Sequence, residues 1–126
     1  MAINPKTPGV HHINFRCLNL DETKKFYRDV IGFPIVLEND ELFAFPAGNV
    51  IVVFKKADNK SSFDPFTVGT DHVAFTCESE EELNRIAKGL SAANVENTGV
   101  KMDPLLQKKY VAFKDPDRIQ LEFYMQ

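Results

Sequence analysis

The chain has 126 residues, of which 44% are hydrophobic, and a formal net charge of −3 at pH 7. This length suits a single domain with a real core, and the scattered lysines form no basic face for nucleic acid or anionic lipid. No run reaches the roughly 20 apolar residues that span a bilayer, and the polar first eight residues, MAINPKTP, hold no signal-peptide stretch. Cys17 and Cys77 fall in predicted strands, so we expect reduced, buried thiols in a cytoplasmic protein.

The first half of the chain, residues 9–54, reads as a strand, a helix and three more strands. Residues 10–17 include alternating apolar positions, which predict a strand. Asp21 is a candidate N-cap for a helix over residues 22–31, and Gly32 suits its left-handed end. Turn-forming residues then separate three further predicted strands: Pro34–Leu37, Leu42–Phe45 and Val50–Phe54.

The second half, residues 69–126, repeats this order after a polar connector at residues 55–68. Residues 72–77 predict a strand, and Ser79 with Glu82 forms a capping-box signature at the start of a helix. Three more strands complete the half: Val95–Val100, Lys109–Phe113 and Ile119–Tyr124.

An internal repeat relates the two halves, because GVHHINFRC at residues 9–17 returns as GTDHVAFTC at residues 69–77. A βαβββ unit with its helix on one face leaves the other face of its sheet uncovered. Two such units can set their sheets side by side and curl them into an incomplete eight-stranded barrel, with the helices outside and a cleft inside. The prediction is therefore one α+β domain over residues 1–126, built from two modules.

Strand alternation places three metal-binding side chains on faces opposite the core. His12 and His72 occupy matching positions in the repeated strands, and Glu122 lies on the non-core face of the last strand. Two imidazoles and one carboxylate form a facial triad that leaves positions open on a divalent ion such as Fe, Mn, Ni, Co or Zn. The alternative is that both histidines only fill a polar cleft.

Asn14 and Arg16 alternate onto the same face as His12 and are candidate substrate contacts. The planar guanidinium of Arg16 can clamp a carboxylate or phosphonate through two hydrogen bonds. The alternative for Arg16 is a salt bridge at the end of the strand.

Aromatic and apolar residues are candidates for the walls of the cleft. Tyr110 and Tyr124 can each offer a hydroxyl group to a substrate, although ordinary half-buried aromatic packing is the favoured explanation for each. Val50, Val52 and Phe54 are expected to make one wall apolar, as is usual for small-molecule sites.

The sequence resembles the vicinal oxygen chelate superfamily, also called the glyoxalase, bleomycin-resistance and dioxygenase family. The resemblance covers nearly the whole chain after residue 8 and implies His12, His72 and Glu122 as metal ligands, a small-molecule substrate and a homodimer. In this family the cleft is sometimes assembled from halves of two chains. Four stretches carry the resemblance: GVHHINFRC, FYRDVIGF at 26–33, DHVAFTC at 71–77 and DPDRIQLEF at 115–123.

At several positions this sequence differs from family members of known activity, and these differences argue against three of the family's reactions. Glyoxalase I-like members carry a glutamate ligand and base in the fourth strand, where the matching residue here is Val52, which can do neither. Extradiol dioxygenases use a further histidine in the cleft, and alternation turns His11, the only spare histidine, away from it. Fosfomycin-resistance thiol transferases carry a serine- and glycine-rich loop where this chain has MDPLLQKKY, and a DPDG motif where it has DPDR, ending at Arg118.

Two classes of function remain open on this basis. The first is a metal-dependent enzyme of the lyase or transferase type that chelates vicinal oxygens of a small molecule. The second is a metal-free protein that sequesters a small molecule, as bleomycin-resistance members do, although these normally lack the ligand set. A degenerate regulatory or structural relative is a third, weaker interpretation.

Overall fold

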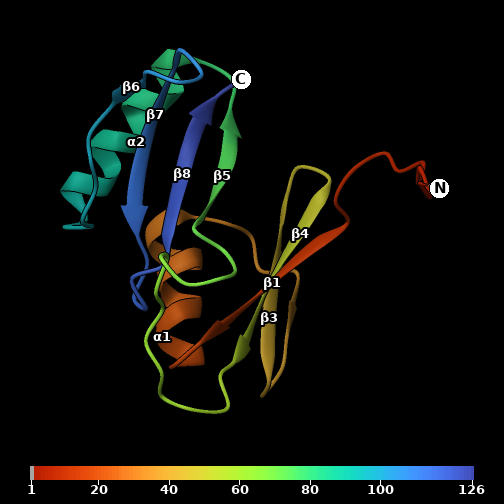
Figure 1. Ribbon diagram of the computed structural model, residues 1–126. Helices are drawn as coiled ribbons and strands as arrows, with labels where there is room; N and C mark the ends of the chain where they lie inside the picture. The colour runs from red at the N-terminus through yellow and green to blue at the C-terminus, as the bar shows by residue number, and fades with distance from the viewer. Residues whose placement is uncertain (1) are drawn as a thin grey trace.

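The structure is a computed structural model that describes residues 2–126, and it contains two four-stranded mixed sheets (Figure 1). In each sheet the first strand of the module pairs in parallel with the last strand, and the other pairings are antiparallel. The strand orders are β1-β4-β3-β2 and β5-β8-β7-β6, so the two modules have the same topology. The predicted α+β fold of two βαβββ modules is confirmed, and the sheets do not close into a barrel.

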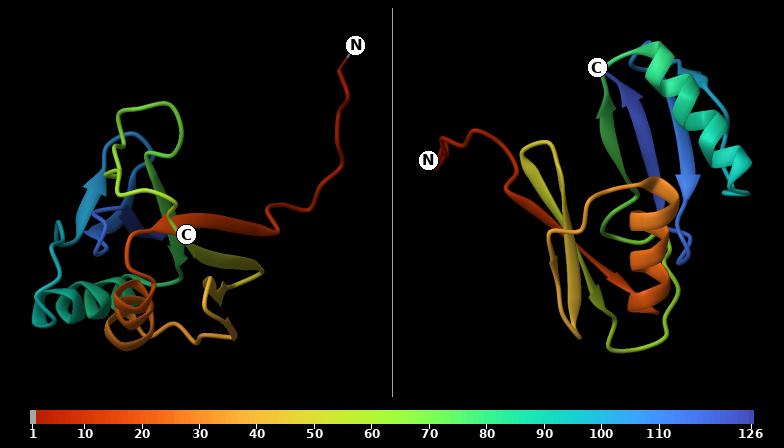
Figure 2. Two further views of the ribbon diagram at one scale, coloured as in Figure 1. Left: turned by 90° about the horizontal axis from the view of Figure 1, so that it is seen from below. Right: turned by 180° about the vertical axis from the view of Figure 1, so that it is seen from behind.

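The first module contains four strands and one helical segment. The helix α1 spans Leu20–Lys25 and continues as a π-helical segment, η1, over Phe26–Ile31. Figure 2 shows this segment between the two sheets. The strands are β1 His12–Cys17, β2 Leu37–Glu38, β3 Leu42–Ala47 and β4 Val50–Lys56.

The second module contains one longer helix, α2, over Glu80–Ala92, which lies across one face of its sheet (Figure 2). Ser79 caps this helix, since its hydroxyl oxygen accepts a hydrogen bond from the backbone of Glu82 at 3.1 Å. No helix among residues 2–126 is long and apolar enough to cross a membrane. The strands are β5 His72–Cys77, β6 Lys101–Asp103, β7 Lys108–Lys114 and β8 Gln120–Met125.

Local side-chain hydrogen bonds overturned two details of the sequence prediction. The N-cap of α1 is Asn19 rather than Asp21, because the Asn19 side chain accepts from the backbone N–H of Glu22 at 3.0 Å. Residues 95–100 form only an isolated bridge and no strand. There, the Asn97 side chain bonds to the backbone two residues before and after it, and Gly99 has a φ of 68°, so turn geometry replaces the extended ladder.

The strand predicted over residues 34–37 lies further along the chain in the structure, where β2 begins only at Leu37. Pro34 has no backbone N–H to donate to a ladder, and the first bond to β3 comes from Val36 to Ala44 at 2.9 Å.

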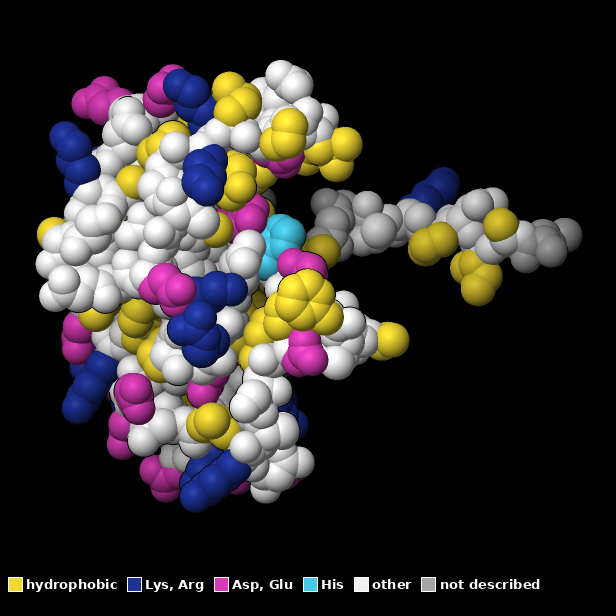
Figure 3. All heavy atoms as spheres, turned by 60° about the vertical axis from the view of Figure 1, so that its left-hand side comes forward, with side chains coloured by type: hydrophobic (Ala, Val, Ile, Leu, Met, Phe, Trp, Pro, Cys, Tyr) yellow, Lys and Arg dark blue, Asp and Glu magenta, His cyan; other side chains and the backbone are white. Residues whose placement is uncertain are grey.

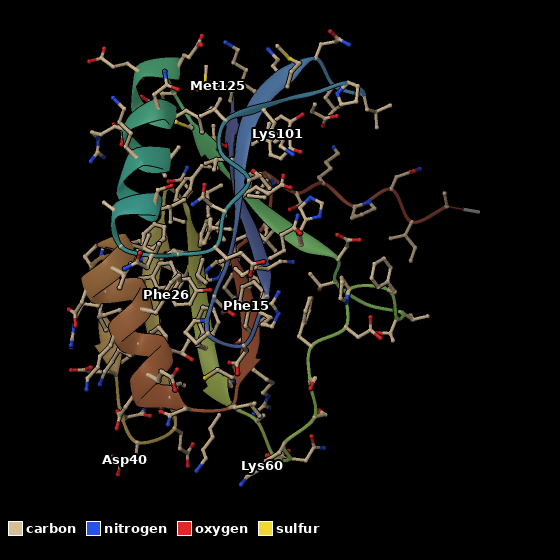
Figure 4. All side chains as sticks on the ribbon, turned by 90° about the vertical axis from the view of Figure 1, so that its left-hand side faces the viewer. Phe15, Phe26, Asp40, Lys60, Lys101 and Met125 are labelled. Carbon is tan, nitrogen blue, oxygen red and sulfur yellow. The ribbon has the colours of Figure 1, made fainter. Side chains whose placement is uncertain are left out.

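A single aromatic core joins the modules. Phe15 and Phe54 stack with their ring centroids 4.9 Å apart inside the first module. Across the junction, Phe26 lies 6.3 Å from Phe113, and Figure 4 shows Phe15 and Phe26 in the interior of the molecule. Because both sheets contribute to this core, burial fixes the inner faces of β1, β3, β4, β7 and β8.

The DPDR turn between β7 and β8 ties the second module to the first. Tyr27, which is fully buried, donates its hydroxyl proton to Asp115 Oδ2 at 2.8 Å. Asp117 Oδ2 accepts from the backbone N–H of Leu18 at 3.2 Å. Arg118 closes the turn at a φ of 63°, the left-handed conformation that the glycine of a DPDG motif adopts more readily.

Burial makes the Asp115 link sensitive to pH. Desolvation raises the pKa of Asp115 to about 6, although its hydrogen bonds from Ile119, Tyr27 and Asp117 oppose the shift. The folded state therefore favours the protonated carboxyl. The stability that this group contributes is complete below its ordinary pKa of about 4, and it is lost as the pH rises through about 6.

We predict that the wild-type protein loses up to about 3 kcal/mol of unfolding free energy, relative to Asp115→Asn, between about pH 4 and pH 7. Asparagine keeps an acceptor oxygen but cannot ionise, so the difference between the two proteins isolates Asp115 from the other titrating groups. Urea unfolding of both metal-free proteins across this range measures the difference. A constant difference would contradict the assignment.

Candidate functional site

The alternation predicted for β1 and β5 is present in the structure. In β1, Phe15 and Cys17 are buried, and the intervening positions, with His12, are exposed. In β5, Cys77 is buried, and His72 lies on the opposite, exposed face. The core therefore directs both imidazoles out of the sheet–helix interior, as the sequence indicates.

The structure brings His72 and Glu122 together. The imidazole Nε2 of His72 lies 3.5 Å from Glu122 Oε1, and the Glu122 side chain is only 9% exposed. The other carboxylate oxygen accepts a hydrogen bond from Gln120 Nε2 at 3.2 Å. This pairing follows from the register of β5 and β8, in which Ala74 lies opposite Glu122.

His12 does not join this pair within one chain. Among residues 2–126, no three histidine, cysteine, aspartate or glutamate side chains lie close enough together to hold a metal ion. The two histidine strands belong to different sheets, in which β1 pairs only with β4 and β5 only with β8 among the described residues. The chain thus contains two of the three predicted ligands as a ready pair and carries the third on a separate sheet.

The predicted orientation of His11 was wrong. Its Nδ1 atom lies 2.9 Å from Nδ1 of His12, with the two rings edge to face, instead of pointing to the opposite side. Alternation applies only inside the strand, and β1 begins at His12, one residue later. Strand alternation therefore does not exclude His11 from the side of the sheet on which His12 lies.

A cavity of about 530 Å³ lies over the His72–Glu122 pair, which is a normal size for a small-molecule site. In Figure 3, histidine and carboxylate side chains lie side by side in the hollow between the two halves of the molecule, with apolar side chains above them. No lysine or arginine is among the described residues that line this cavity. The lining of this cavity includes the ionisable pair and several apolar or aromatic side chains: His72, Glu122, Tyr110, Tyr124, Leu105 and Leu106.

Tyr110 and Tyr124 both line this cavity, as was considered for them from the sequence, and their rings stack with centroids 5.8 Å apart. The hydroxyl of Tyr124 donates to Asp103 Oδ2 at 2.7 Å. Desolvation and this bond raise the pKa of Tyr124 to about 12, and the same bond lowers the pKa of Asp103. Asp103 was missed from the sequence because only the register of β6, β7 and β8 brings it across to Tyr124.

Asn14 and Arg16 line a different cavity, of about 690 Å³, beneath the connector. Arg16 Nη1 donates to the backbone carbonyl of Lys56 at 2.9 Å. No carboxylate among residues 2–126 forms a salt bridge with Arg16, so the alternative explanation of an ion pair at the strand end is wrong. In one chain, the predicted substrate contacts on β1 are therefore separate from those around Glu122.

The register of β4 corrects the predicted apolar wall and the predicted fourth-strand position. Val52 and Phe54 pair with core-facing residues of β1 and are 1% and 0% exposed, so they belong to the core. Val53, which lies opposite Asn14, takes the place in the first module that Glu122 takes in the second. The conclusion about chemistry stands, since valine at this position can neither bind an ion nor remove a proton.

The comparisons with known proteins agree with this geometry. The family model described as Glyoxalase/Bleomycin resistance protein/Dioxygenase superfamily matches residues 9–123. The uncharacterized protein YwkD of Bacillus subtilis is 29% identical, over 94% of this chain and 97% of its own length. The metallothiol transferase FosB of Staphylococcus haemolyticus is 24% identical, over 92% of this chain and 82% of its own.

Among solved structures, the glyoxalase family protein from Enterococcus faecalis superposes with a TM-score of 0.77 at 25% sequence identity. The match covers 93% of this chain and 97% of that one. The repeated βαβββ topology, the paired His72 and Glu122, and a family match over almost the whole chain agree with one another. The chain belongs to the glyoxalase/bleomycin resistance protein/dioxygenase superfamily.

Proposed function

We propose that this protein is a metal-dependent enzyme that chelates vicinal oxygens of a small-molecule substrate. His12, His72 and Glu122 would hold one divalent ion. The observation that carries the proposal is the pair formed by His72 Nε2 and Glu122 Oε1, 3.5 Å apart, at a cavity that no lysine or arginine of the described residues lines.

The spacing of this pair fits a shared ion. Ligand bonds of about 2.1 Å arranged tetrahedrally separate two donor atoms by about 3.4 Å. A neutral imidazole and a carboxylate suit Fe, Mn, Co, Ni or Zn, and three protein ligands leave positions open for a substrate. The hydrogen bond from Gln120 holds Glu122 in place without occupying the oxygen nearest to His72.

The third ligand is proposed to come from a second copy of the chain. Both β1 and β5 are edge strands with one side unpaired, and such edges readily accept another strand. In a twofold dimer, β1 of one protomer can lie beside β5 of its partner, and the same contact then forms twice. Each of the two sites would combine His12 of one protomer with His72 and Glu122 of the other.

The residues present favour transferase chemistry, or a lyase reaction other than that of glyoxalase I. A bound ion supplies Lewis-acid stabilisation of charge on the substrate oxygens. The chain offers no carboxylate at Val53 to act as a base, so a reaction that needs proton abstraction from that side is disfavoured. The match to a metallothiol transferase over 92% of the chain supports the transferase alternative.

The cavity also indicates the kind of substrate. Leu105 and Leu106, which are 84% and 62% exposed, stand at its rim in the segment where thiol transferases have a serine- and glycine-rich loop. With tyrosine rings opposite and no cation in the described lining, this half of the site suits an apolar arm attached to a pair of oxygens. It suits a phosphonate poorly.

A metal-free binding protein is the second candidate function. One chain by itself provides a cavity of about 530 Å³ with apolar and aromatic side chains in its lining, and no group of three donors exists among residues 2–126. A protein that only sequesters an apolar small molecule needs no more than this. The two candidates differ in metal content, which is directly measurable.

Free thiols support a cytoplasmic location. Cys17 and Cys77 are buried and unpaired, which suits a reducing compartment. Burial raises the pKa of Cys17 to about 11, so this thiol stays protonated and unreactive at neutral pH.

We predict about one divalent ion per chain in the purified, untagged protein, and its loss in His72→Ala, because that variant removes one of three ligands. Elemental analysis after gel filtration measures the content. The matched control is Thr76→Ala, four positions further along the same face of β5, which should retain the ion. Equal metal content in wild type and His72→Ala would refute the proposed site.

Mixing two inactive variants distinguishes a shared site from one within a chain. His12→Ala and His72→Ala homodimers should each bind no metal. After co-refolding, a mixed dimer has one site with both defects and one intact site, so it should bind about one ion per two chains. Separate tags allow its isolation, and metal content is the readout. A mixed dimer without metal, beside a wild type that binds it, would exclude the shared arrangement.

A further inference from the structure

The same backbone position precedes each proposed histidine ligand and contacts it in the same way. His11 precedes His12, and Asp71 precedes His72, in the repeated GVHH and GTDH segments. Each side chain lies within hydrogen-bond distance of Nδ1 of the histidine that follows, at 2.9 Å and 2.7 Å respectively. A histidine in the first module and an aspartate in the second therefore make the equivalent contact, to Nδ1 of the histidine that follows.

From this we infer that Asp71 and His11 are positioning residues, which hold the Nδ1 side of His72 and His12 so that Nε2 of each ring is free to bind the ion. The inference rests on the proposed function for the identity of the ligands. The inference gives a role to two residues that are not among the proposed metal ligands.

The Asp71 contact fixes the hydrogen-bonding state of His72. A carboxylate only accepts hydrogen bonds, so the 2.7 Å contact requires the proton to sit on Nδ1 of His72. In the neutral ring, the lone pair is then on Nε2, the nitrogen that faces Glu122 at 3.5 Å. A metal-binding histidine commonly has such a carboxylate behind it, which sets both the tautomer and the ring orientation.

The His11 contact can do the same for His12. Of two Nδ1 atoms 2.9 Å apart, one must donate and the other accept. When His12 donates, its Nε2 carries the lone pair and His11 keeps its own proton on Nε2. The opposite assignment would protonate His12 Nε2 and block it as a ligand, so only the first is compatible with metal binding.

The backbone has the same conformation ahead of both contacts. Gly9 and Gly69 lie two residues before these positions at φ values of 143° and 138°, a region that disfavours side-chain-bearing residues. Both positioning residues come just before their strand begins, where alternation does not yet apply. The residue ahead of each histidine can therefore turn back to its ring.

Zinc binding to the full-length, metal-stripped protein tests the inference. Asp71→Ala and His11→Ala should each weaken zinc binding about 10- to 100-fold in a chelator competition, the usual effect of losing such a partner. Asp71→Asn keeps an acceptor oxygen and should recover most of the affinity. The control is Asp40→Ala, which removes the same charge from the exposed turn between β2 and β3 (Figure 4) and should bind like wild type.

A second readout does not depend on metal. Two-bond ¹H–¹⁵N NMR of the metal-free protein distinguishes a neutral ring from a charged one and reports which ring nitrogen of a neutral imidazole carries the proton. His72 should be protonated on Nδ1 in wild type and Asp71→Asn, and should shift toward Nε2 protonation in Asp71→Ala. His12 should shift likewise in His11→Ala.

Asp71→Ala tests the positioning of His72, and His11→Ala tests the positioning of His12. If wild type binds zinc while the alanine variant binds equally well with an unchanged tautomer, the positioning role is overturned and the proposed metal site survives. If wild type binds no zinc, the proposed function fails, and the positioning role fails with it.

Discussion

Burial of one aromatic core that spans both modules determines the direction of the three proposed ligands, His12, His72 and Glu122. Phe15 and Cys17 in β1 and Leu121 in β8 must face this core. Because a strand presents successive side chains to opposite faces, the same burial turns His12 and Glu122 the other way. The donor atoms owe their placement to apolar neighbours one residue away, which is why a slip of one residue in either strand would remove the site.

This dependence explains which features were predictable from the sequence. Alternation, turns and the internal repeat gave the module topology, the faces of β1, β5 and β8, and the pair of His72 with Glu122. They failed where a local hydrogen bond outweighs a periodic pattern. Asn19 displaces Asp21 as a cap, and Asn97 with Gly99 turns the chain where alternation indicates a strand.

Register and strand ends could not be read from one strand alone. The assignment of Val52 instead of Val53 arose because alternation within β4 is uniformly apolar, and only pairing with β1 identifies its core face. The predicted orientation of His11 was wrong because the sequence does not mark where β1 starts. Asp71 was visible in the repeat beside His72, but its role depends on a 2.7 Å contact that spacing does not reveal.

The junction between the modules bears on how the site is completed. Tyr27 on η1 and the backbone of Leu18 are both held by the DPDR turn, through Asp115 and Asp117. These two bonds and the shared aromatic core oppose a rotation that would carry β1 across to β5 of the same chain. A junction held in this way keeps the two edge strands apart, so that among the described residues β1 pairs only with β4 and β5 only with β8. The residues that hold one chain together thus also keep His12 apart from the pair of His72 and Glu122, which is the geometry that the proposed shared site requires.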